Sequence, residues 1–175
     1  MKTKSNLGLV HVITGDGKGK TTSSIGSAVR ALGRGLKVRF IQLFKRDTGE
    51  KGNLEKLGVE YFQFKPMHPC FKKHSEKNLE GLRKELLEFW KKSIINLDQV
   101  NVLIVDELGP ALNWKVMDEN FVLSFIKNKP ENLELILTGR DFPGSIRKLS
   151  DYVSEIKMKK HPYNKGIMAR KGIEF

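Results

Sequence analysis

One stretch near the start of the sequence carries the residue types and the spacing needed to bind phosphate. Residues 14–22 read Thr-Gly-Asp-Gly-Lys-Gly-Lys-Thr-Thr, with three glycines and two lysines in one run. Glycines let successive backbone N–H groups turn inward around an anion, and a helix that starts directly afterwards adds a partial positive charge. The pattern predicts a phosphate-binding loop in which Lys20 reaches the terminal phosphates and the Thr21 hydroxyl binds Mg²⁺.

This loop departs from the usual Gly-x-x-x-x-Gly-Lys-Ser/Thr pattern at its first position. Counting back from Gly19 places Thr14 where glycine is usual, and Gly15 follows one residue late. The core of the pattern, from Gly19 to Thr21, is intact. An apolar run over residues 7–13 precedes the loop and a helical pattern over residues 23–32 follows it. This strand–loop–helix context favours phosphate binding over a plain glycine-rich turn.

Two further charged groups follow apolar strands. Asp106 and Glu107 come directly after the most apolar run of the chain, residues 100–105, in the Walker B pattern, where carboxylates hold Mg²⁺ beside a phosphate loop. An N-cap role for Asp106 is the alternative. Arg140 follows the expected strand at residues 133–137. An arginine at that place points into the same crevice and stabilises charge on a departing phosphate group; a plain surface arginine is the alternative.

Composition limits the class of protein. No apolar run approaches the ~20 residues that span a membrane, and no apolar segment follows the short basic N-terminus as in a signal peptide. One cysteine excludes an internal disulfide and fits a reducing cytoplasm, where we expect the protein. The net charge of +12 invites a nucleic-acid partner, but the lysines are scattered and no aromatic RNA-binding signature is present. We expect neither nucleic acid nor membrane as a partner.

Strand and helix patterns alternate along the whole chain. Strands are expected at residues 7–13, 37–44, 59–64, 100–105, 133–137 and 152–156, and helices at 23–32, 53–57, 75–95, 121–126 and 143–149. The polar residues 45–52 are expected to form a loop that faces the ligand crevice. The glycines and aromatic end of the last segment favour a hairpin or an ordered edge. The fold class is α/β, a P-loop (RecA-like) three-layer fold with a mostly parallel sheet, in one domain spanning residues 1–175.

Taken together, these motifs resemble one family, the ATP:corrinoid adenosyltransferases of cobalamin synthesis and salvage. The resemblance rests on the loop at residues 15–22, on Arg30 in the following helix, and on the segments Val105-Asp-Glu-Leu108 and Thr138-Gly-Arg140. It also rests on the ending, which contains His161-Pro-Tyr163 and Lys171-Gly-Ile-Glu-Phe175. The late first glycine, a defect against the general pattern, is what this family shows.

The resemblance implies the reaction and the roles of residues. ATP would donate its 5′-deoxyadenosyl group to a Co(I) corrinoid, and triphosphate would leave. Lys20 and Arg140 would be the catalytic residues, while Thr21, Glu107 and Asp106 would hold Mg²⁺ or Mn²⁺. The ligand-binding residues implied are Gly15, Asp16, Gly17, Lys18, Gly19, Lys20, Thr21, Thr22, Arg30, Arg140 and Phe71.

The family also implies partners and a corrinoid contact. An aromatic residue on a loop presses on the corrinoid in this family, and Phe71 in the stretch 65–74 is the best candidate here, with Met67 next. The tryptophan pattern expected in that loop is missing. A flavoprotein reductant and a homodimer are implied as well. A P-loop ATPase or nucleotide kinase is the alternative function; a kinase should carry an arginine-rich lid, which the sequence lacks.

Overall fold

Six parallel strands form one sheet in the order β3-β2-β4-β5-β1-β6. The computed structural model describes residues 7–66 and 76–174. Its strands are β1 (Val10–Thr14), β2 (Val38–Leu43), β3 (Glu60–Phe64), β4 (Val102–Asp106), β5 (Glu134–Thr138) and β6 (Tyr152–Glu155). The predicted α/β class with a parallel sheet is confirmed, and the most apolar run is a central strand, β4.

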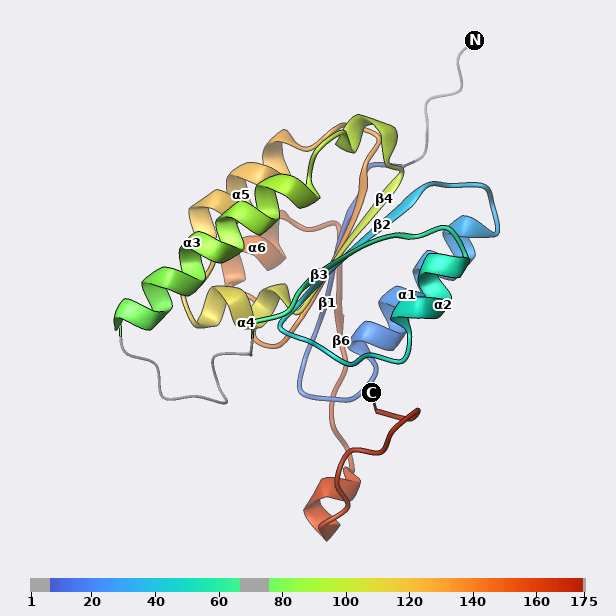
Figure 1. Ribbon diagram of the computed structural model, residues 1–175, viewed down its shortest axis with the longest axis vertical. Coiled ribbons are helices and arrows are strands. Elements are labelled where there is room, and N and C mark those ends of the chain that lie inside the picture. Colours follow the sequence, from blue (N-terminus) through green and yellow to red (C-terminus); the bar gives the residue numbers. More distant parts are fainter. Residues whose placement is uncertain (1–6, 67–75, 175) are drawn as a thin grey trace.

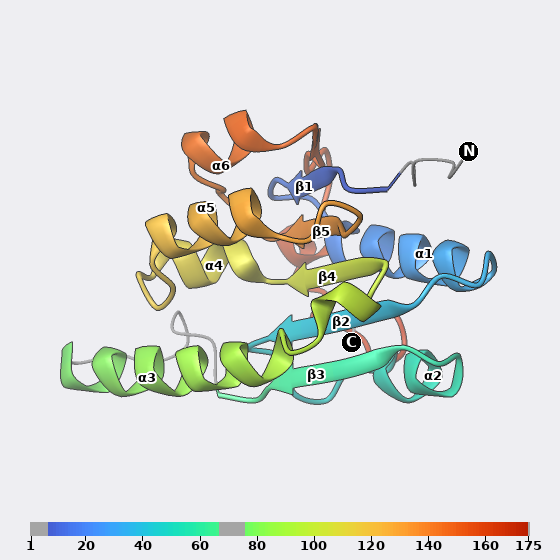
Figure 2. The same cartoon turned by 90° about the horizontal axis from the view of Figure 1, so that it is seen from above.

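Helices cover both faces of this sheet, which gives three layers (Figure 1). The helices α1 (Lys20–Leu32) and α2 (Lys51–Lys56) lie on one face. The other face carries α3 (Glu76–Ser93), α4 (Leu108–Asn113), α5 (Glu119–Asn128) and α6 (Gly144–Leu149), as Figure 2 shows from above. Short 3-10 helices occur at Leu97–Gln99 and Pro162–Lys165. No helix in the described part of the chain is long and apolar enough to cross a membrane.

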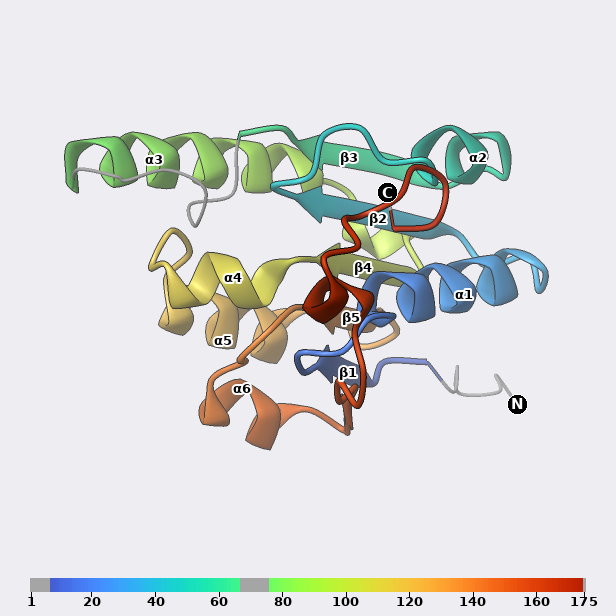
Figure 3. The same ribbon diagram turned by 90° about the horizontal axis from the view of Figure 1, so that it is seen from below.

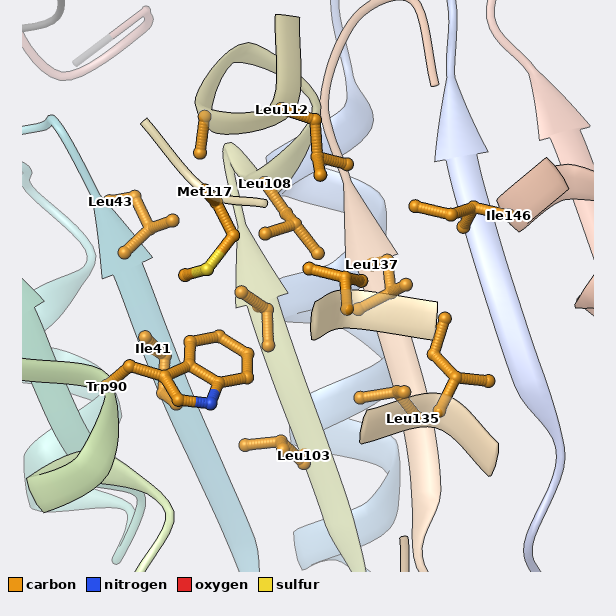
Figure 4. Packing of buried hydrophobic residues seen from close by; sticks show 14 of the residues in the cluster. Ile41, Leu43, Trp90, Leu103, Leu108, Leu112, Met117, Leu135, Leu137 and Ile146 are labelled. Carbon is orange, nitrogen blue, oxygen red and sulfur yellow. The ribbon is translucent and has the colours of Figure 1, made fainter. Parts of the chain in front are cut away.

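Side chains from the strands alternate between two hydrophobic clusters, one on each face. Leu103 and Val105 of β4 belong to the cluster under α3 to α6, whereas Val102 and Ile104 belong to the cluster under α1 and α2. Because both faces are covered, the central strand β4 is a continuous apolar run from Val102 to Val105. Trp90 of α3 is fully buried over this sheet (Figure 4) and packs edge-on against aromatic rings of α5.

The strand order determines which segments meet at the carboxyl edge of the sheet. The strand β5 lies between β1, which leads into the glycine-rich loop, and β4, which ends at Asp106. On the other side of β4, Gln42 of β2 is paired with Asp106. The loop, the end of β4, the segment after β5 and the segment after β2 therefore lie next to one another, as expected for ligand crevices in parallel α/β sheets.

Two elements differ from the sequence expectations. The helix α4 was not predicted; it begins directly after Glu107, whose φ of 63° turns the chain out of β4. The last segment forms neither a hairpin nor a sheet edge in its described part. It forms a 3-10 helix capped by Gly166 and a turn over residues 171–174 that contains Gly172, and both glycines lie in the left-handed region. Figure 3 shows this segment crossing beneath the carboxyl ends of the strands.

Candidate active site

The glycine-rich loop is tied to the segment that follows β6. The Gly17 N–H donates to the Ile156 carbonyl at 2.8 Å, and the Met158 N–H donates to Asp16 Oδ1 at 3.0 Å. Gly15 has φ 106°, and a Cβ atom built on it would lie 2.3 Å from the Ile156 carbonyl oxygen. Glycine at position 15, one residue later than usual, is thus required by the close approach of residue 156.

Replacing Gly15 with alanine is expected to destabilise the protein by about 2 kcal/mol or more, because of positive φ and the overlap with Ile156. Gly26→Ala is the matched control, since no atom lies within 4 Å of a Cβ at that helical position. The control variant is expected to be more stable than the wild type by about 0.5–1 kcal/mol in the free energy of unfolding. Urea denaturation of both variants measures the difference, and equal stabilities would contradict this account of the late glycine.

A pocket of about 940 Å³ lies over the loop. Its lining comes from four places: loop residues 16–22 with Ile25, residues 45–50 with Asn53, the side chains Glu107 and Arg140, and the tail residues His161 and 172–174. These segments are far apart in the sequence and meet only at the carboxyl edge of the sheet. The prediction that residues 45–52 face the crevice is confirmed for residues 45–50.

Two cations of this pocket lie close enough to affect each other. Lys20 is half-buried and its ammonium donates to the Gly17 carbonyl at 2.8 Å. Burial lowers the pKa of Lys20, and the positive charge of Arg140 lowers it further. Arg140 is held by a close backbone approach, because a Cβ at Gly139 would lie 2.5 Å from the Gly109 nitrogen. Two neighbouring cations in a concave site form a receptor for a multiply charged anion.

Beneath the pocket, a fully buried carboxylate accepts hydrogen bonds from four donors that belong to three segments. Asp106 Oδ1 accepts hydrogen bonds from the hydroxyls of Thr138 at 2.6 Å and Thr21 at 2.8 Å. Its Oδ2 accepts from Lys45 Nζ at 2.8 Å and from Gln42 Nε2 at 3.3 Å. Four donors satisfy this buried charge, which would otherwise be costly. Asp106 therefore fixes the loop, the β2 segment and β5 around one point.

Lys45 completes this cluster. Its ammonium donates to Thr21 Oγ1 at 2.7 Å and lies 3.3 Å from Glu107 Oε1, in addition to its contact with Asp106. Burial alone would lower the pKa of Lys45, but the negative charges of Asp106 and Glu107 outweigh burial and raise the pKa above its ordinary value. Oxygen atoms of Thr21, Asp106 and Glu107 thus converge on one cation.

These oxygens have the chemistry of a Mg²⁺ site. Mg²⁺ prefers hydroxyl, carboxylate and water oxygens and is bound in nucleotide sites by one or two carboxylates plus phosphates. In residues 7–66 and 76–174, no group of three or more His, Cys, Asp or Glu side chains could hold a metal by itself. The residues therefore fit a cation that a phosphate helps to bind, and Thr21, Asp106 and Glu107 are the protein groups that would hold it.

The tail also reaches the loop. Glu174 accepts from Lys18 Nζ at 3.0 Å and pairs with Arg170 at 3.0 Å. Hydrogen bonds from the Arg170 side chain and backbone, and then one from Lys18, lower the pKa of Glu174 to about 2. In this structure the Lys18 ammonium is therefore already paired with a carboxylate of the tail.

The structure brings most of the predicted site residues together. Asp16 to Thr22, Glu107 and Arg140 line the pocket, while Gly15 supports the loop from behind and Asp106 lies directly below. Arg30 is exposed on α1 and is not among the lining residues, because ten residues of helix at about 1.5 Å each separate it from Lys20. The single chain therefore does not bring Arg30 to the anion site. Phe71 and Met67 lie outside the described residues.

Sequence reasoning missed Lys45. The available signal was its position, since it is an early residue of a polar loop that follows a buried strand. What could not be read was the pairing of β2 with β4, which brings Lys45 to Asp106.

Comparison with solved structures supports the fold. A KaiC-like protein of the archaeon Pyrococcus horikoshii OT3 matches with a TM-score of 0.54 and 14% identity, covering 89% of this chain and 75% of that one. At this identity the likeness concerns the fold alone, which is that of a RecA-like P-loop domain.

Comparison with sequences supports a much closer relation. Curated corrinoid adenosyltransferases match nearly the whole chain: that of Escherichia coli K12 is 33% identical, with 99% of this chain and 89% of the relative covered. Corrinoid adenosyltransferase CobA of Salmonella typhimurium is 32% identical over the same shares, and the Pseudomonas aeruginosa relative is 29% identical. The family model described as ATP:corrinoid adenosyltransferase BtuR/CobO/CobP matches residues 6–175. The chain therefore belongs to the ATP:corrinoid adenosyltransferase family.

Proposed function

We propose that this protein transfers the 5′-deoxyadenosyl group of ATP to a Co(I) corrinoid and releases triphosphate, in cobalamin synthesis or salvage. The proposal rests on the pocket that this member of the family carries. Lys20, Arg140 and the glycine-rich loop line this pocket, which lies above the buried Asp106. The cobalt electron pair attacks C5′ of the ribose, the C5′–O5′ bond breaks, and the bonding electrons leave on O5′ with the triphosphate.

This reaction requires neither a nucleophile nor a general base from the protein. Co(I) is itself strongly nucleophilic, so the protein's task is to position C5′ and to stabilise the leaving group. A triphosphate carries about four negative charges, and charge grows on O5′ as the bond breaks. Lys20, Lys18 and Arg140 would balance these charges, together with the backbone N–H groups at the start of α1. Lys20 would exchange its contact with the Gly17 carbonyl for a phosphate oxygen.

The metal would be held by Thr21 and Glu107, with Asp106 beside them. When bound there, Mg²⁺ or Mn²⁺ supplies further positive charge next to the leaving phosphate oxygens. The chain's own contribution is to orient the oxygens: Thr138 and Gln42 fix both oxygens of Asp106, and Asp106 fixes the Thr21 hydroxyl. This arrangement favours an ordered cation site close to Lys20.

The proposals about corrinoid binding and about partner proteins are based on the family to which the chain belongs. Phe71, or else Met67, is proposed to contact the corrinoid, although both lie outside the described residues. A flavoprotein reductant, a homodimer and a cytoplasmic location are likewise proposals. The ATPase or nucleotide kinase alternative gains no support from the comparisons.

The proposal is tested by mixing the protein with ATP, Mg²⁺ and chemically reduced cobalamin under anaerobic conditions. A light-sensitive cobalt–carbon product that forms only with both substrates is expected. ATP consumption at the same rate without any corrinoid would instead identify an ATPase. A reaction with adenylate or nucleoside acceptors, but not with the corrinoid, would identify a kinase.

A further inference from the structure

Lys45 occupies the position in which the proposed metal site would bind its cation. Its Nζ lies within hydrogen-bond reach of Thr21 Oγ1 and Asp106 Oδ2 and close to Glu107 Oε1, the three groups assigned to the metal. A lysine ammonium and a divalent cation cannot occupy the same position between these oxygens, because two positive charges so close together repel each other strongly. One must leave when the other arrives.

The local environment explains why a cation is needed there before any metal binds. Asp106 is fully buried, and Glu107 follows it at the end of the same strand. In the described part of the chain, the salt bridges of both carboxylates are made by Lys45. Without Lys45, the buried charge of Asp106 would keep only the neutral donors Thr21, Thr138 and Gln42. Lys45 thus keeps the site assembled.

The Lys45 side chain can also turn away from the carboxylates into the pocket. It lines the pocket and its side chain is 30% exposed on the pocket side, whereas Asp106 is sealed from solvent. Lys20 and Arg140 line the same pocket. A long flexible side chain there can turn from the carboxylates to a phosphate oxygen of a bound nucleotide.

We propose that Lys45 is a positioning residue that holds the metal site in its empty state and yields it to the divalent cation when the nucleotide enters. The metal then binds to Thr21 and the carboxylates, and the displaced ammonium contacts the triphosphate. The free enzyme consequently has low affinity for the metal alone, and metal and nucleotide bind together. This inference rests on the metal site of the proposed function.

The test measures binding of Mn²⁺ to the nucleotide-free protein by electron paramagnetic resonance, with neither ATP nor corrinoid present. In Lys45→Met the competing ammonium is gone, so the affinity for Mn²⁺ is expected to rise about tenfold or more over the wild type. Lys45→Arg keeps the positive charge and is expected to bind Mn²⁺ as weakly as the wild type. The matched control is Lys51→Met, because Lys51 pairs with Glu55 and does not line the pocket.

Thermal unfolding gives a second readout that does not depend on turnover. Lys45→Met is expected to melt below the wild type without metal and to recover with Mn²⁺, while the wild type changes little. Lys45→Gln replaces Lys45→Met in both measurements if the latter fails to fold. Equal Mn²⁺ affinity in the wild type and the neutral variants would overturn the proposal. Since no corrinoid is used, that result would leave the proposed transfer reaction untouched.

Discussion

Lys20→Ala is expected to slow adenosyl transfer by at least about 10²–10³-fold, because the variant loses a cation aimed at charge that develops on the triphosphate. The half-buried Lys20 ammonium touches only the Gly17 carbonyl among the contacts described, so its removal leaves little of the fold unsupported. Initial rates with chemically reduced corrinoid measure the loss, and circular dichroism and thermal unfolding check that the fold is intact.

Lys37→Ala is the control for this variant. Lys37 is exposed, lies at the opposite end of β2 from the pocket, and uses its backbone rather than its side chain to bond Asn101. The Lys37→Ala substitution removes one positive charge, as Lys20→Ala does, from a protein whose net charge is +12. This control variant is expected to keep the full rate of adenosyl transfer. Turnover of Lys20→Ala close to that of Lys37→Ala would exclude the proposed role of the loop.

Asp106→Ala is expected to lower both stability and metal-dependent activity. The substitution removes the acceptor for four donors and leaves Lys45 with a single nearby carboxylate, Glu107. Breaking a buried ion pair costs about 3–5 kcal/mol, and because Lys45 is partly exposed we expect about 2–3 kcal/mol here. Activity is expected to fall at least about 10²-fold and to need more Mg²⁺.

Asp118→Ala provides the comparison for this second variant. Asp118 caps α5 by accepting a hydrogen bond from the Phe121 N–H at 2.8 Å, and it does not line the pocket over the glycine-rich loop. Loss of this cap is expected to lower the free energy of unfolding by about 1 kcal/mol, with no change in the Mg²⁺ requirement of the reaction. Denaturation curves and rates measured across a Mg²⁺ titration separate the two effects. An unchanged Mg²⁺ requirement in Asp106→Ala would contradict its place beside the metal.

Much of this architecture could be read from local sequence. The apolar run directly before Asp106 predicted a strand with carboxylates at its carboxyl end, and β4 is that strand. Likewise, the position of Arg140 after a strand predicted that it faces the crevice, and Arg140 lines the pocket. These inferences succeeded because the carboxyl ends of parallel strands always meet at one edge.

Contacts between distant segments could not be read in the same way. The Gly15 position depends on Ile156, more than a hundred residues further on, and the role of Lys45 depends on which strands are neighbours. The turn that starts α4 is made by Glu107 with positive φ, a conformation that non-glycine residues rarely adopt. For Arg30, the expectation came from the family resemblance, whereas the length of α1 places it away from the pocket.

The most direct test of the central claim is the identity of the phosphorus product. Phosphorus-31 NMR of a reaction with ATP, Mg²⁺ and Co(I) corrinoid should show inorganic triphosphate appearing in step with the adenosylated corrinoid. That product requires the C5′–O5′ bond to break while the three phosphates stay joined to one another. ADP with phosphate, or AMP with pyrophosphate, as the first products would contradict the account.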